Sequence, residues 1–192
     1  MPRFLVALAM IVAASRSGSA QTISLVPCEG TRPRVGVLVG VSGDRERSVD
    51  VGLDASASLE VGIKDGVGIR VDAGTFTSTL GRDYQLNQPT RFDDVLLKRV
   101  AVMVIRTHTA WCEDRARLFW GLGVGRYRYR FEHRQDPPIG RSGLRGIAGV
   151  EIATSRVVSW SAEVGVDAIR GPEDYPYTLF VASARFGVKV RF

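Results

Sequence analysis

Apolar and polar residues alternate along most of the chain from Arg34 to the C-terminus. An alternation with a period of two predicts β-strands that have one apolar and one polar face. The 21 glycines and the many valines disfavour helices over this stretch. We expect eight strands, at residues 34–42, 55–64, 67–79, 95–111, 117–131, 142–153, 157–169 and 178–192.

The connections between these strands alternate in length. Long polar segments are expected at 43–54, 80–94, 132–141 and 170–177, and short links at 65–66, 112–115 and 154–156. The shortest link, Asp65-Gly66, is typical of a two-residue hairpin turn, in which glycine adopts a positive φ. Each strand is therefore expected to pair antiparallel with the next, and both chain ends to lie at the end with short links.

The two faces of the strands differ in charge. In strands 55–64, 157–169 and 178–192, one face is apolar throughout, and a tilted strand needs about 9 to 11 residues to cross a bilayer. An eight-stranded barrel is narrow enough for side chains to fill its interior. We therefore expect Val164 and Val166 to face lipid and the charges of both signs on the opposite face to form a salt-bridged lumen. These charges are Glu60, Arg70, Asp72, Glu151, Glu163, Asp167, Arg185 and Lys189.

Two strands alternate less regularly. In strand 95–111 the valines share a face with Lys98 and Arg106, so the sequence leaves its facing open. In strand 117–131 the apolar face passes to Arg126, Arg128 and Arg130. Either a β-bulge near Gly125 or a strand end that projects beyond the lipid would produce this change.

The N-terminal residues indicate export. A basic start leads into an apolar stretch at 4–14 and then into small and polar residues, the layout of a signal peptide that we expect to be cleaved after Ala20. Removing Arg3 and Arg16 lowers the net charge from +6 to +4. Residues 21–33 are expected to form a periplasmic segment and residues 34–192 the barrel.

The mature sequence has no apolar segment long enough for a transmembrane helix, which takes about 20 residues. If the chain crosses a membrane, it must do so as a closed β-barrel, because only this other arrangement satisfies all backbone hydrogen bonds in lipid. The predicted fold is an all-β, eight-stranded antiparallel up-and-down transmembrane β-barrel. Long loops of such barrels face outside and short turns face the periplasm.

Two cysteines remain in the exported chain. Cys28 precedes the first strand and Cys112 follows the fourth, so both are expected at the periplasmic end. A single disulfide can persist in that compartment. We expect a Cys28–Cys112 bridge that draws residues 21–33 across the opening, the alternative being two unrelated thiols.

Aromatic residues lie mostly near the predicted strand ends, where outer-membrane barrels carry interfacial girdles. The C-terminal residues give a more specific signal, because the last strand ends in Gly187, Val190 and Phe192. This ending resembles the C-terminal assembly signal of outer-membrane barrels, and the chain from Arg34 to Phe192 resembles the small OmpA/OmpX-type barrels. The resemblance implies an outer-membrane location and insertion by the barrel-assembly machinery. The predicted girdle residues are Trp111, Trp120, Tyr127, Tyr129, Phe131, Tyr175, Tyr177, Phe186 and Phe192.

The sequence offers little support for catalysis. His108 falls at the periplasmic end of its strand, and no serine stands at a set spacing from His133. Two histidines and two cysteines lack the spacing of a zinc site, and we expect no cofactor. The glycines at 121–125 lie inside a strand pattern, which argues against a phosphate-binding loop. Nucleic acid is excluded as a partner because an exported barrel does not meet it.

Arginines on the outer side indicate a possible lipid partner. Arg126, Arg128, Arg130 and Arg134 map to the outer end, at the height of the phosphates of lipopolysaccharide. Guanidinium groups bind phosphate well, although solvated loop charges explain the same residues. The function that fits best is a non-enzymatic structural or surface-interacting barrel of unknown ligand. The alternatives are a lipopolysaccharide-modifying enzyme and a narrow pore.

Overall fold

The computed structural model describes residues 26–27, 32–44, 51–82, 91–109, 116–131, 137–170 and 178–192. Within these ranges, no helix is long and apolar enough to span a membrane. The strands in this part of the chain are β1 (Val26–Pro27), β2 (Arg34–Asp44), β3 (Gly52–Lys64), β4 (Val67–Arg82), β5 (Arg91–Thr109), β6 (Ala116–Phe131), β7 (Ile139–Ala153), β8 (Val158–Arg170) and β9 (Thr178–Arg191).

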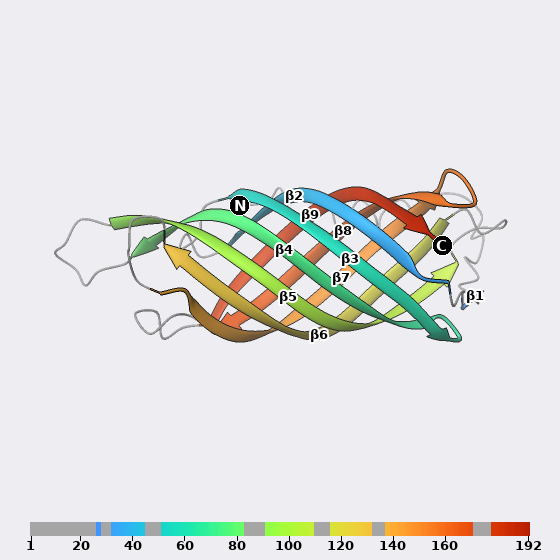
Figure 1. Cartoon of the computed structure of the whole chain (residues 1–192), viewed down its shortest axis with the longest axis horizontal. Helices are drawn as coiled ribbons and strands as arrows, with labels where there is room; N and C mark the ends of the chain where they lie inside the picture. Colours follow the sequence, from blue (N-terminus) through green and yellow to red (C-terminus); the bar gives the residue numbers. More distant parts are fainter. Residues whose placement is uncertain are drawn as a thin grey trace, which may run out of the picture.

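Strands β2 to β9 form a closed antiparallel barrel, in which each strand pairs with its neighbours in sequence (Figure 1). The first and last strands close the barrel, with a continuous register from Arg34 opposite Arg191 to Asp44 opposite Val181. The predicted eight-stranded up-and-down barrel is therefore confirmed. We call the end that carries connections 45–51, 83–90, 132–138 and 171–177 the loop end, and the opposite end the turn end.

The strands are longer at the loop end than the sequence pattern indicated. β4 continues to Arg82 and β5 begins at Arg91, and their pairing runs to the last residue of each. Residues 80–82 and 91–94 of the loop expected at 80–94 therefore belong to a strand ladder, because backbone hydrogen bonds stabilise the extension without any alternation of apolar residues. Of the two explanations for the change in strand 117–131, the bulge near Gly125 is excluded, since β6 pairs without a register shift on both sides.

The turn between β3 and β4 has the expected geometry. Asp65 and Gly66 both have a positive φ, 51° and 75°, which suits the twist of a two-residue hairpin. The backbone nitrogen and the hydroxyl of Thr107 donate hydrogen bonds of 2.7 and 3.0 Å to the carbonyl oxygen of Gly66. These bonds attach the hairpin to β5.

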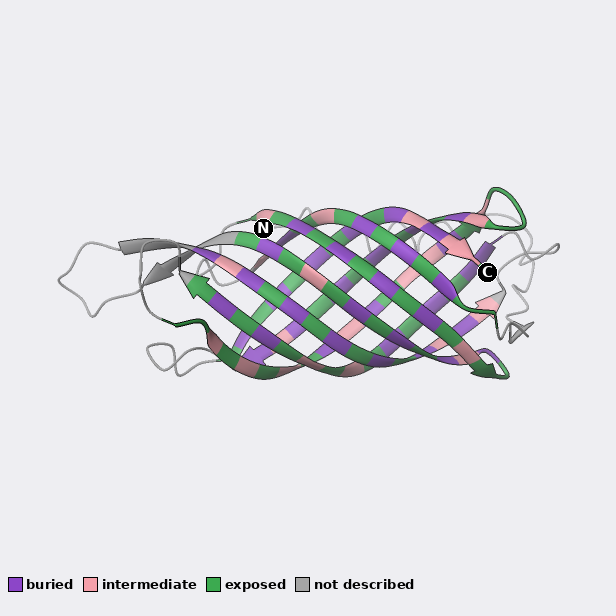
Figure 2. Ribbon diagram, in the orientation of Figure 1, coloured by how far each residue is buried: buried purple, intermediate pink, exposed green. Residues whose placement is uncertain are grey.

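Burial alternates along every long strand of the barrel, and its sense is inverted relative to a water-soluble protein (Figure 2). Apolar side chains such as Val37, Leu122 and Leu144 point outward and are 63 to 65% exposed. Charged side chains point inward, and Arg70 and Asp72 are completely buried. In β5 Val100, Val102 and Val104 face outward and Arg99 faces inward, which settles the facing that the sequence left open.

The short strand β1 pairs with the turn end of β5, with Val26 opposite Thr109 and Pro27 opposite His108. β2 lies three strands away from β5 around the barrel wall. β1 and the start of β2 therefore lie at distant parts of the wall, both at the turn end. The predicted Cys28–Cys112 bridge and the signal peptide lie outside the described residues.

Candidate functional site

The lumen contains one group of charged side chains near the turn end. Arg34 and Arg117 each place a guanidinium nitrogen 2.9 Å from Oε1 of Glu60. Arg117 also donates to Glu151, and Lys189 lies 3.4 Å from both carboxylates. Three cations thus share two anions, and this group carries a net charge of 3 − 2 = +1.

A second group occupies the middle of the lumen. Arg70 donates to both carboxylate oxygens of Glu163, over 2.7 and 3.2 Å. Arg185 contacts Glu163 as well and lies 3.0 Å from Asp72. Asp72 is also 3.2 Å from Arg145, which connects this group to the next level.

Toward the loop end the network continues around Asp167. One carboxylate oxygen of Asp167 accepts hydrogen bonds from Arg99 and Arg145, at 3.0 and 2.5 Å, and the other accepts one of 2.6 Å from the hydroxyl of Tyr127. Arg99 also lies 3.3 Å from Asp54. The middle and upper groups together hold four arginines and four carboxylates, so their net charge is 4 − 4 = 0. Each charge is thus compensated by direct contacts, which buried charges require.

Apolar side chains fill the lumen above the charges. Tyr127 and Tyr129 point inward and are 0 and 1% exposed, so the prediction that they belong to an interfacial girdle is wrong. The ring of Tyr127 occupies the space that side chains at Gly125 and Gly143 would need. The complete apolar layer at the loop end, which we call the apolar plug, is Phe76, Val95, Leu97, Tyr127, Tyr129, Ile169, Leu179 and Val181, with Ile139 packed against it.

The outer wall carries cations near the loop end. Arg126, Arg128 and Arg130 alternate with the buried tyrosines of β6, and all three are exposed. Lys98 is opposite Arg128 and is also exposed. Arg134 lies outside the described residues. The apolar face of β6 therefore ends in a row of basic side chains, without any change of facing.

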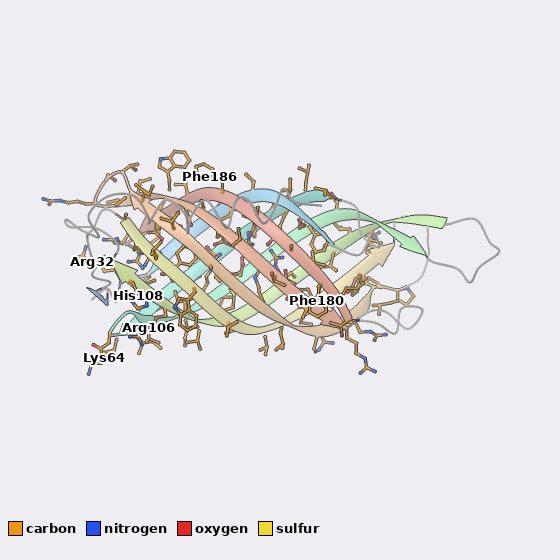
Figure 3. All side chains as sticks on the ribbon, turned by 180° about the vertical axis from the view of Figure 1, so that it is seen from behind. Arg32, Lys64, Arg106, His108, Phe180 and Phe186 are labelled. Carbon is orange, nitrogen blue, oxygen red and sulfur yellow. The ribbon has the colours of Figure 1, made fainter. Side chains whose placement is uncertain are left out.

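Cations also border the apolar wall at the turn end, where Lys64 and Arg106 lie on the outer side (Figure 3). Phe180 and Phe186 point outward from β9, Phe180 nearer the loop end and Phe186 nearer the turn end. Phe186 stacks on Trp160 with a distance of 5.2 Å between ring centroids. The apolar surface is thus a band with polar borders on both sides.

All eight charged residues predicted for the lumen are buried there. The prediction did not include five further residues of the network, Arg34, Asp54, Arg99, Arg117 and Arg145. At the C-terminus, Gly187 faces the lumen where β9 meets β2, and a Cβ atom at this position would lie 1.9 Å from the carbonyl oxygen of Val37. Glycine at position 187 therefore permits the close approach of these strands. Val190 pairs with Val35, and Phe192 is exposed at the turn end.

The described residues show no group of three or more histidine, cysteine, aspartate or glutamate side chains able to hold a metal ion. His108 is half-buried in β5 at the turn end, beside Pro27 of β1. His133 lies outside the described residues. The carboxylates of the lumen are engaged with arginines and lysine, so they form a structural network and not an arrangement of free acids and bases.

Comparisons with known proteins identify the fold. No protein-family model matches the chain, and no curated protein matches its sequence. The structure is similar to Neisserial surface protein A (TM-score 0.62, 13% identity), with 83% of this chain and 97% of that chain covered. It is also similar to OprG of Pseudomonas aeruginosa (0.60, 13%, 84% and 96%) and to Ail, the attachment invasion locus protein of Yersinia pestis (0.55, 13%, 84% and 99%). At these identities the likeness establishes the fold and not the activity.

Proposed function

We propose that this chain is an integral protein of the bacterial outer membrane and that it acts without catalysing a reaction. Its fold is that of the small eight-stranded outer-membrane barrels. In this proposal residues 1–20 are a cleaved signal peptide, and the loop end faces the outside. The barrel then serves as a structural or surface-interacting component of the envelope. The single observation that supports this most is the combination of a charged interior with an apolar exterior.

The size of the apolar band supports a membrane location. On β5, Lys98 and Arg106 border the valines, and eight residues at about 3.3 Å each with a tilt of about 40° give a height of about 20 Å. Eight strands give a circumference of about 50 Å, and the band therefore covers about 1,000 Å². Water-soluble monomers rarely expose apolar patches above about 600 Å², so this band needs a lipid environment.

The packing of the lumen argues against a pore. Three charge groups and the apolar plug lie inside the lumen, and Tyr127 and Arg145 are almost completely buried. An ion crossing this lumen would have to displace paired charges and then pass an apolar layer. We therefore expect no steady conductance from the purified protein in planar bilayers.

The outer cations support contact with lipopolysaccharide. Arg126, Arg128 and Arg130 project outward at the border of the apolar band, at the expected height of lipid phosphates. If these arginines are instead only solvated loop charges, replacing them is expected to have no effect on lipid binding. An enzyme acting on lipopolysaccharide is the second class of function, and mass spectrometry of lipid A from cells with and without the protein separates the two. A changed acyl pattern would contradict our proposal.

Membrane fractionation combined with gel electrophoresis of heated and unheated samples tests the location and fold together. We expect the protein in the outer-membrane fraction, with a mobility that changes on heating. A periplasmic protein whose mobility is the same with and without heating would contradict the proposal. The resemblance of the C-terminal residues also implies delivery by the barrel-assembly machinery, so depletion of this machinery is expected to reduce the folded form.

A further inference from the structure

An open apolar groove lies on the outer wall over β6, β7 and β8, with a volume of about 320 Å³. Small residues on β7 form its floor, because Gly146 stands between Leu122 of β6 and Val166 of β8. Two residues further toward the turn end, Ala148 lies between Trp120 of β6 and Val164 of β8 in the same way. The groove therefore follows β7 and is walled by larger side chains on both neighbouring strands.

A polar position at the height of the outer cations lies above this groove. Along the outer face of β7, the position after Gly146 toward the loop end is Leu144, and the next is Ser142, which is exposed. Ser142 is opposite Arg126 of β6. On the other side, Ile169 of β8 is opposite Gly143, so the following residue, Arg170, stands beside Ser142. Arg126 and Arg170 are both exposed, and they flank one hydroxyl group.

The two arginines can reach a common ligand. Their backbones are two strand spacings apart, or about 10 Å, and both side chains are long. The guanidinium group of Arg126 already extends over β7, where one of its nitrogens is 3.5 Å from the Cβ position of Gly140. A tetrahedral anion between the arginines would accept hydrogen bonds from both guanidinium groups.

The distance from the cations to the groove fits a lipid. Ser142 and Gly146 are four residues apart, and Ser142 and Ala148 six, which corresponds to about 13 and 20 Å along the strand. One leaflet contributes about 15 Å of a hydrocarbon core that is about 30 Å thick. An acyl chain attached to a headgroup at Ser142 therefore has the length needed to lie over Gly146 and Ala148.

The charge of this wall favours an anionic headgroup. Among the acidic residues whose burial the structure describes, only Asp65 is exposed, and it lies in a hairpin at the turn end. At the loop end, the outer wall thus presents Lys98, Arg126, Arg128 and Arg170. None of the acidic residues whose burial is described is exposed there. A phosphate group meets only attractive charges from these side chains.

We propose that the wall over β6, β7 and β8 binds one molecule of lipopolysaccharide through its lipid A. A lipid A phosphate lies between Arg126 and Arg170, where the hydroxyl of Ser142 donates to it. One acyl chain lies in the groove over Gly146 and Ala148. This site rests on the proposed outer-membrane location, because only there does the loop end of the barrel meet lipid A.

Native mass spectrometry of the full barrel in mild detergent, titrated with purified lipid A, tests the site. The double variant Arg126→Gln, Arg170→Gln removes the headgroup contacts, and Gly146→Leu fills the groove. We expect each to lower the affinity for lipid A at least about tenfold, as the loss of charged hydrogen bonds predicts for the double variant. Dephosphorylated lipid A is expected to bind the wild type as weakly as lipid A binds the double variant.

Matched controls make the result specific. Arg156→Gln removes an exposed cation at the turn end, and Ala57→Leu enlarges an exposed small residue on β3, away from the groove. Both controls are expected to bind lipid A as the wild type does. The change of gel mobility on heating, measured for every variant, shows that the barrel is folded.

Three outcomes would overturn the site. These are wild-type affinity in folded Gly146→Leu, wild-type affinity in the folded double variant, and equal binding of phosphatidylglycerol and lipid A by the wild type. Each of these leaves the proposed membrane function intact if the wild-type protein fractionates with the outer membrane. A wild-type protein found outside that membrane would instead contradict the proposed function itself.

Discussion

Replacing Asp167 by asparagine tests whether the lumen is a dry, charge-balanced interior. Asp167 is completely buried and accepts hydrogen bonds from Arg99, Arg145 and Tyr127. Asparagine has nearly the same shape, and its carbonyl oxygen can still accept from Tyr127. The substitution therefore removes one negative charge with little change in packing, and the middle and upper groups go from neutral to a net charge of +1.

The expected cost follows from the loss of one partner of a buried ion pair. Such a loss destabilises proteins by about 3 to 5 kcal/mol, because the remaining charge is buried without compensation. Arg99 retains Asp54, and Arg145 retains Asp72, which favours the lower end of this range. We expect a loss of about 3 kcal/mol in the free energy of unfolding. Val166→Leu, a change of the adjacent residue on the lipid face, is expected to stay within about 0.5 kcal/mol.

Urea titration of the barrel in detergent micelles, with the folded fraction read from gel mobility without heating, measures this difference. The double variant Asp167→Asn, Arg145→Met restores neutrality, and we expect it to recover most of the loss. If Asp167→Asn costs less than about 1 kcal/mol, the value typical of solvent-screened pairs, water fills the lumen and screens its charges. A water-filled lumen of this kind could also conduct ions, contrary to the expected absence of steady conductance.

Three further predictions concern other parts of the chain. Val164→Arg places a charge on the lipid face near mid-membrane and should destabilise the folded barrel by about 2 to 4 kcal/mol, whereas Val164→Leu should be neutral in the same titration. Alkylation of the unreduced, denatured protein should label neither Cys28 nor Cys112, and two labelled thiols per chain would refute the bridge. The bridge should contribute up to about 4 kcal/mol to the free energy of unfolding. Removal of Phe192 should reduce the folded form in the outer membrane while the purified chain still folds in detergent, and unchanged assembly in cells would argue against a C-terminal signal.

The sequence predicted the strands best where one face is apolar without interruption. In β3, β8 and β9 the alternation of charge and apolar residues directly gives the facing that the structure shows, with Glu163 inside and Val164 outside. The hairpin at Asp65-Gly66 could be predicted equally well, because its geometry requires residues that tolerate a positive φ. These features depend on local pattern alone.

The lumen residues that the prediction omitted differ in how far the sequence pattern could have placed them. Arg99 belongs to β5, whose outward face mixes valines with Lys98, so its facing could not be assigned from periodicity. Arg145 has the same parity as Glu151 on β7, and this signal could have placed it in the lumen. The inward position of Tyr127 was harder to predict, since it depends on the space left by Gly143 on the neighbouring strand.

The closing contact between β2 and β9 has a consequence for the order of assembly. Every other pair in the barrel joins strands that are adjacent in sequence, whereas this pair joins the two ends of the wall. Its loop closure spans almost the whole barrel sequence, so it has the largest entropic cost of any pairing and is expected to form last. β9 also carries the predicted assembly signal. If the assembly machinery holds the edge of β9 that faces β2, the barrel cannot close until that edge is released.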